Sequence, residues 1–158
     1  MTTRNTRYWR SFLSDLLSSR DSPNNDCPSD GFYDGVCVLT LFGRVEYRDG
    51  CFQSASSRFL DVNPLQLVAL FDDLTRHALQ EAVGGDRERA TAALRLGATV
   101  FHVVSATFSS VCAVTRGRSR GLVVEKLPFG VVAVAFSAPL QLETVFRHVD
   151  GACAALRR

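Results

Sequence analysis

Residues 111–139 constrain the fold of this chain more than any other segment, because they contain three short apolar runs separated by turn-forming residues. The runs are rich in valine and lie at 111–114, 122–125 and 131–136. A basic, glycine-containing segment at 115–121 separates the first two, and Pro128-Phe129-Gly130 separates the last two. Short valine-rich runs broken by glycine and proline are typical of an antiparallel meander. We therefore expect a sheet made of consecutive hairpins.

Hydrophobic spacing predicts the other regular elements. Apolar side chains at 8–20 and at 142–156 recur every three or four residues, as on one face of a helix. Strands are expected at 36–41 and 45–47, which form a hairpin, and at 99–104. Asparagine can cap a helix and proline is tolerated at its first position, so Asn63-Pro64 predicts a helix that continues to about residue 82.

The order of these elements is helix, two strands, helix, four strands and helix. This order predicts an α+β fold with a central antiparallel sheet of about six strands. We expect the N- and C-terminal helices to pack on one face of the sheet and the middle helix on the other. The chain of 158 residues suits a single domain spanning 1–158. The polar segments 21–31 and 83–93 are predicted to be loop insertions.

Charge and hydropathy argue against three classes of protein. The formal net charge of +2 is too small to suggest general nucleic-acid binding. No apolar run approaches the ~20 residues of a membrane span. The apolar segment near the N-terminus is interrupted by serines and Asp15, unlike a secretory signal. We therefore expect a cytoplasmic protein.

The five cysteines are predicted to be reduced core residues. They include no C-x-x-C pair, which argues against a zinc site. Four of them lie in or beside apolar runs, where cysteine usually behaves as a small apolar residue. The cysteines are Cys27, Cys37, Cys51, Cys112 and Cys153.

Catalysis is not expected from this sequence. His77, His102 and His148 fall in different predicted elements and show no metal-type pairing. The chain contains neither a P-loop motif nor a G-x-G-x-x-G segment after a strand. The glycine-containing segment 115–121 lies between two strands, so no helix N-terminus is available there for a phosphate. We predict no catalytic residue, metal or cofactor.

Several short motifs occur in an order that resembles the profilin family. Trp9 and Phe12 lie in the first helix, and Asn63-Pro64 begins the middle helix. Leu96-Gly97-Ala98 precedes a strand, as in that family. The strongest overlap is the basic loop, a strand at 121–126 ending in lysine, and then Ser137-Ala138-Pro139 before the last helix. The resemblance covers about residues 8–158 and implies the profilin fold.

The resemblance implies two binding surfaces. Profilins bind monomeric actin through the later strands, the middle helix and the start of the last helix. The basic residues on the matching segments are Arg76, Arg116, Arg118, Arg120 and Lys126. Since part of the complementary actin surface is acidic, these side chains would steer association. The same residues could bind phosphoinositide headgroups.

The second implied surface binds proline-rich ligands, such as those of formin-type nucleators. Aromatic faces stack on the rings of a polyproline helix. The residues that could supply this surface are Tyr8, Trp9, Phe12 and His148. Two positions depart from the family: Glu46 stands in place of a tryptophan, next to Tyr47, and Ala152 in place of an aromatic.

Two functions therefore follow from the sequence. The first is a profilin-type regulator of actin assembly, located in the cytoplasm and cytoskeleton. The alternative is a divergent adaptor of the roadblock or longin type, which would serve a trafficking or signalling complex without binding actin. A shared scaffold does not determine which of the two is correct.

Overall fold

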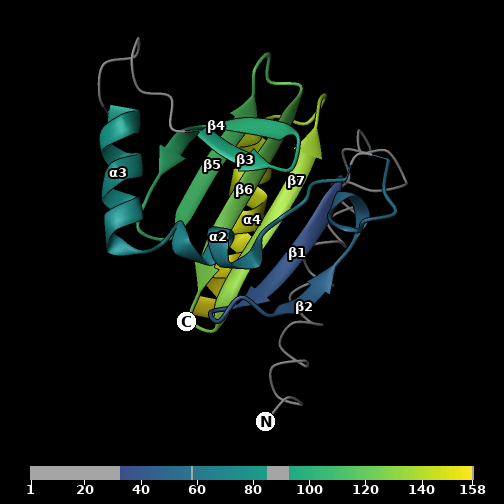
Figure 1. Ribbon diagram of the computed structural model, residues 1–158. Helices are drawn as coiled ribbons and strands as arrows, with labels where there is room; N and C mark the ends of the chain where they lie inside the picture. The colour runs from purple at the N-terminus through teal and green to yellow at the C-terminus, as the bar shows by residue number, and fades with distance from the viewer. Residues whose placement is uncertain (1–32, 58, 85–92, 158) are drawn as a thin grey trace.

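A computed structural model shows a seven-stranded antiparallel sheet with helices on both faces (Figure 1). It describes residues 33–57, 59–84 and 93–157. The strands lie in the order β2-β1-β7-β6-β5-β4-β3. Their bounds are β1 Gly35–Thr40, β2 Val45–Arg48, β3 Ala93–Leu96, β4 Thr99–Ala106, β5 Ser110–Thr115, β6 Arg120–Leu127 and β7 Gly130–Ser137. The α+β architecture predicted from the sequence is confirmed, and the predicted helix at 8–20 lies outside the described residues.

The meander expected at 111–139 is present and forms the middle of the sheet. β5, β6 and β7 pair in sequence, with Cys112 opposite Val123 and Val123 opposite Val134. β1 then pairs with β7, so that Val38 lies opposite Val132. Their valines are almost completely buried. Burying one such side chain contributes about 1.5–3 kcal/mol, so these central strands account for much of the stability of the fold.

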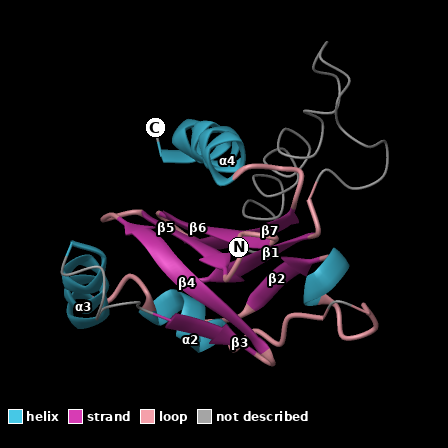
Figure 2. Ribbon diagram, turned by 90° about the horizontal axis from the view of Figure 1, so that it is seen from above, coloured by secondary structure: helices cyan, strands magenta, loops and turns pink. Residues whose placement is uncertain are grey.

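The two faces of the sheet carry separate cores. One core contains Leu39, Phe101 and Leu122 and is covered by the short helix α2 (Pro64–Ala69) and the 3-10 helix η2 (Gly50–Phe52). The other contains Val38 and Val123 and is covered by α4 (Leu142–Arg157). Figure 2 shows α4 on one side of the sheet and α2 and α3 (Asp73–Gly84) on the other. The predicted placement of the middle and C-terminal helices is therefore correct.

The middle helix differs from the prediction because it is divided in two. Asn63 caps α2 as expected, since its side-chain oxygen accepts a hydrogen bond from the Leu65 amide at 3.1 Å. After α2 the backbone hydrogen bonds follow the 3-10 pattern, because the amides of Leu70 and Phe71 donate to carbonyls three residues earlier. This turn buries Leu70 and Phe71 in the core.

The sheet has one more strand than the sequence suggested. β3 begins at Ala93, which the sequence assigned to a loop insertion, and pairs with β4 so that Leu94 lies opposite Phe101. Leu94 and Leu96 are buried while Arg95 is exposed. The four residues of β3 are at the short end of the range over which alternation predicts a strand. Gly97, at φ +63°, makes the turn into β4.

No helix in the described part of the chain is long and apolar enough to cross a membrane. The four described cysteines are buried and free, as predicted for core residues. Cys27 lies outside the described residues.

Candidate functional site

The C-terminal helix leaves part of its sheet face uncovered. α4 packs over β1, β7, β6 and the start of β5 and does not extend over β4 or the end of β5. A hollow of about 600 Å³ lies between this part of the sheet and the start of α4. It is lined by Val104, Val114, Arg118, Phe136, Ala138, Pro139, Leu140, Gln141, Leu142 and Glu143. The hollow therefore offers polar and apolar surface in similar amounts, with one basic and one acidic side chain.

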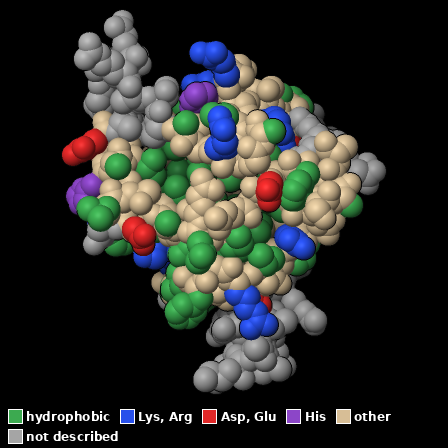
Figure 3. All heavy atoms as spheres, in the orientation of Figure 1, with side chains coloured by type: hydrophobic (Ala, Val, Ile, Leu, Met, Phe, Trp, Pro, Cys, Tyr) green, Lys and Arg blue, Asp and Glu red, His purple; other side chains and the backbone are tan. Residues whose placement is uncertain are grey.

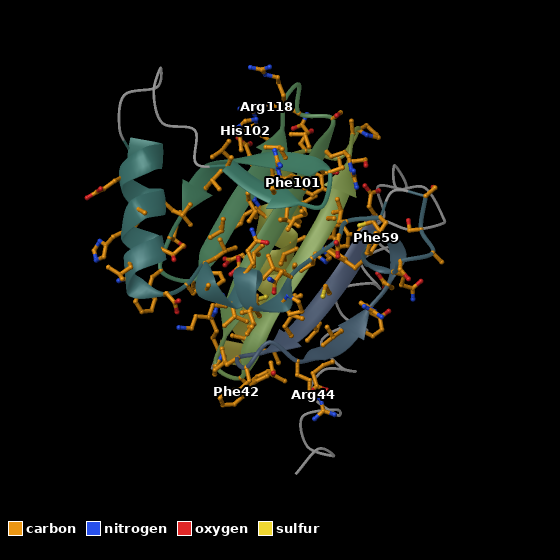
Figure 4. The ribbon with its side chains drawn as sticks, in the orientation of Figure 1. Phe42, Arg44, Phe59, Phe101, His102 and Arg118 are labelled. Carbon is orange, nitrogen blue, oxygen red and sulfur yellow. The ribbon has the colours of Figure 1, made fainter. Side chains whose placement is uncertain are left out.

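The β5–β6 turn presents Arg118 to this hollow. Gly117 and Arg118 both have positive φ, +85° and +59°. The Arg118 amide donates to the Thr115 carbonyl at 2.8 Å, and the Thr115 hydroxyl accepts from the Arg120 amide at 3.1 Å. Left-handed backbone is uncommon outside glycine, so these hydrogen bonds define the turn that carries Arg118. Figure 4 shows Arg118 at the same end of the sheet as His102.

The basic residues predicted from the sequence are divided between different surfaces. Arg118 lines the hollow, and the exposed Arg116 shares its turn. Arg120 lies toward the opposite face of the sheet, near enough to Cys51 for its charge to lower the pKa of that thiol. Burial has the larger effect and raises the pKa of Cys51 to about 11. Lys126 follows six residues along β6, roughly 20 Å from Arg120 at the usual rise of a strand.

Arg76 and Lys126 come together around a different residue. The Arg76 guanidinium carbon lies 4.8 Å from the centre of the Phe108 ring, and the Lys126 Nζ lies 5.9 Å from it. Phe108 is on the β4–β5 turn, at the opposite end of β5 from Arg118. Of the five predicted basic residues, Arg76 and Lys126 therefore lie together at one end of the sheet. The other three lie in or beside the β5–β6 turn at the other end.

Gly121 shapes the wall of the hollow. It lies opposite Phe136 in the β6–β7 ladder. A Cβ at Gly121 would lie 2.2 Å from the Phe136 Cζ, so the ring rests directly on the glycine backbone. Because Phe136 lines the hollow, any side chain at Gly121 would displace part of its wall.

Of the predicted proline-binding residues, His148 is the one within the described chain. Its ring stacks on Tyr33 with centroids 5.8 Å apart, and its Nδ1 hydrogen bonds with the Tyr33 hydroxyl. Burial lowers the pKa of His148, which favours the neutral ring. Tyr8, Trp9 and Phe12 lie outside the described residues.

Two tyrosines lie on the same face as His148. Tyr33 is buried beside β1, and Tyr47 packs against the core under α4 and donates to the Asp49 carboxylate at 2.7 Å. Burial raises the pKa of Tyr47 to about 12. Glu46, the neighbour of Tyr47, is exposed, and Ala152 packs against the same core. Sequence reasoning missed Tyr33, although an aromatic residue directly before a strand was a usable signal.

The residues lining the hollow were also missed as a group. Val104, Val114 and Phe136 occupy the alternate positions of their strands, on the face opposite Phe101. Phe136 also belongs to the core under α4 and Val114 is buried, so of the three Val104 is the exposed one. Metal binding has no support among residues 33–57, 59–84 and 93–157, where no three His, Cys, Asp or Glu side chains are grouped for a metal ion. His77, His102 and His148 lie on α3, β4 and α4, in separate elements as predicted.

The fold is that of known profilins. Acanthamoeba castellanii profilin II matches with a TM-score of 0.60 and 15% identity over 92% of each chain. The chain is also similar to the LokiProfilin2 structure in complex with rabbit actin, with a TM-score of 0.57 and 12% identity over 93% of each chain. Mouse profilin IIa, in complex with a double repeat from the FH1 domain of mDia1, matches with a TM-score of 0.57 and 15% identity over 94% of this chain and 96% of the other.

Sequence comparison alone does not find this relationship. No family model matches the chain, and no curated protein sequence matches it either. At 12–15% identity the likeness lies in the arrangement of the elements, along nearly the full length of both chains. This chain therefore has the profilin fold.

Proposed function

We propose that this protein binds monomeric actin in the manner of a profilin and regulates actin assembly in the cytoplasm. The observation that carries the proposal is the hollow between β4, the end of β5 and the start of α4, with Arg118 at its edge. The resemblance to profilins implies an actin surface on these same segments. One similar structure is a profilin-fold protein in complex with rabbit actin. The protein acts by binding rather than by catalysis.

Apolar contact would supply part of the affinity at this surface. Val104, Val114 and Phe136 provide the apolar wall, and Leu142 comes from the helix. Arg118 and Arg116 on the turn would meet acidic groups of the partner, which raises the association rate and sets the orientation. Arg116, Arg118 and Arg120 are also proposed to contact phosphoinositide headgroups, because clustered arginines attract anionic lipids.

We also propose that proline-rich segments bind on the face that carries His148, Tyr33 and Tyr47. These side chains lie together beside α4, and Tyr8, Trp9 and Phe12 would complete the surface. Mouse profilin IIa was solved with a double FH1 repeat. With Glu46 and Ala152 in place of two aromatic residues, we expect weak binding. The reported similar structures are profilins, which gives no support to a roadblock or longin-like adaptor.

Actin binding is tested by the effect of the full chain on pyrene-labelled actin assembly. The variant Arg116→Ser/Arg118→Gly removes both charges and suits the positive φ of residue 118. It should weaken actin binding about tenfold at low salt, and less at high salt. The control Arg44→Ser removes an exposed arginine at the opposite end of the sheet (Figure 4) and should change nothing. Failure of the wild-type chain to slow assembly would refute the proposal.

Proline binding is tested separately by retention on a poly-L-proline column. Trp9→Ala should abolish retention, and Tyr47→Ala should reduce it; Tyr47 is not among the described residues that line the hollow. Unchanged retention in both variants, with both proteins folded, would place the proline site elsewhere.

A further inference from the structure

Large hydrophobic side chains are exposed at the end of the molecule opposite Arg118. Phe42 is 90% exposed, Leu74 88%, Phe108 69% and Leu65 62%. Figure 4 shows Phe42 pointing away from the sheet at this end, and Figure 3 shows hydrophobic side chains over the same part of this face. Grouped exposed apolar residues of this size mark interaction sites in folded proteins. We refer to this surface, comprising Phe42, Leu65, Leu74, Phe108 and the hollow described next, as the apolar end.

A small hollow lies in the middle of the apolar end. Its volume is about 170 Å³, and its lining is Leu41, Val68, Phe71, Asp72, Lys126 and Val131. An apolar cavity of about 150 Å³ accommodates a benzene ring. The hollow is thus of a size to receive one large apolar side chain, with one acidic and one basic group at its wall.

Both exposed phenylalanines are on turns that hydrogen bonds hold in place. The Thr40 hydroxyl accepts from the amides of Phe42 and Arg44, at 3.3 and 3.0 Å. The Thr107 hydroxyl accepts from the Ser110 amide at 3.0 Å, on the turn that carries Phe108. Surfaces that are ordered before binding lose less entropy on association. Phe42 and Phe108 therefore lie on turns that are ordered before a partner binds.

Positive charge surrounds the apolar end. Arg76 and Lys126 both lie over the Phe108 ring. Arg44 is exposed beside Phe42 at the same end (Figure 4). Among the described side chains, Asp72 in the hollow is the acidic counterpart. The excess of basic groups favours an acidic ligand and would repel a second copy of the same surface.

We propose that the apolar end binds a short segment of a partner protein in which one large apolar side chain is flanked by acidic residues. The apolar side chain enters the hollow, and the acidic residues face Arg44, Arg76 and Lys126. A lipid surface has no side chain to fill a hollow, so the concave shape favours a protein segment. This site is separate from the proposed actin and proline surfaces.

The test measures binding of a synthetic peptide to the full chain by fluorescence anisotropy. The labelled peptide has one phenylalanine flanked on both sides by glutamates, and the comparison peptide has lysines in place of the glutamates. We expect the glutamate peptide alone to bind. Phe108→Ser and Lys126→Glu should each weaken its binding about tenfold, the effect of losing one anchoring contact.

The matched control is Phe59→Ser, which removes a partly exposed phenylalanine away from this end (Figure 4). It should bind the peptide like the wild-type chain, and the melting temperatures of all three variants would establish that they fold. Equal binding of both peptides, or no loss in folded Phe108→Ser and Lys126→Glu, would overturn the proposal. Self-association of the chain that Phe108→Ser abolishes would also overturn the proposal. The same holds if the chain binds anionic vesicles and does not bind the peptide.

Discussion

Arg157, in the last turn of α4, donates a hydrogen bond of 2.5 Å to Glu125 in the middle of β6. Glu125 is completely buried, and its Oε1 has no hydrogen-bond partner among the described residues. The same guanidinium donates to the Lys126 carbonyl at 2.8 Å. This contact ties the end of the helix to the sheet. The opposite end of α4 is where the larger hollow lies.

The buried Glu125 makes stability depend on pH. Burial raises the pKa of Glu125 from 4.5 to about 7, more than Arg157 lowers it, and nearby Asp150 adds to the rise. The folded state therefore binds a proton more tightly than the unfolded state. Protonated Glu125 therefore contributes to the free energy of unfolding below pH 4.5. This contribution, roughly 3 kcal/mol, is lost as the pH rises through about 7.

Chemical denaturation at pH 5 and pH 8 measures this effect when the wild-type chain is compared with Glu125→Gln. Glutamine cannot titrate. The free energy of unfolding of wild type minus that of the variant should therefore be larger at pH 5 than at pH 8. His148 acts in the opposite direction, because burial lowers its pKa, but it is present in both proteins and cancels. A difference that does not vary with pH would contradict the prediction.

Gly121→Val should destabilise the fold by about 1–3 kcal/mol, the usual cost of overfilling a packed site. The new side chain would collide with the Phe136 ring, whose Cζ lies 2.2 Å from the position of a Cβ. Thermal unfolding provides the measurement. A melting temperature equal to that of wild type would show that the ring moves aside freely.

Gly151→Ala should have the opposite effect and stabilise the protein by about 1 kcal/mol. Gly151 lies inside α4, and a Cβ there would meet no atom of the described residues within 4 Å. Alanine favours the helix by about that amount over glycine. The same unfolding assay applies, so this variant is also the control for Gly121→Val. A lower melting temperature would mean that the site is not open.

Asn63→Ala should cost about 1 kcal/mol, because it removes the cap that accepts a hydrogen bond from the Leu65 amide. Asn63→Asp keeps an accepting oxygen and should retain most of the stability. Denaturant midpoints for the three proteins distinguish these outcomes. Equal loss in both variants would show that the side-chain oxygen is not what stabilises α2.

The described cysteines should react with thiol reagents after unfolding and not before. Burial raises the pKa of Cys37 and of Cys112 to about 12, and it also raises that of Cys153. In a Cys27→Ser variant, Ellman's reagent at pH 8 should find almost no reactive thiol until denaturant is added. Rapid labelling of the folded variant would show that one of these thiols is accessible.

Local sequence patterns predicted the fold well where long apolar runs and strong turn residues coincide. The meander at 111–139, the cap at Asn63 and the amphipathic helix at 142–156 were all identified correctly. The short strand β3 and the break after α2 were not, because both depend on packing of residues such as Leu94 and Phe71 into the core. Such packing is not visible in a window of a few residues.

The sequence by itself determined the α+β class, the buried cysteines and the presence of a basic turn, since each depends on neighbouring residues. Only the tertiary structure decided that Arg118 faces the larger hollow while Arg76 and Lys126 meet at Phe108. Alternate strand residues point to opposite faces, so charges close together in the sequence reach different surfaces. The pairing of distant strands and helices then determines which side chains share a site.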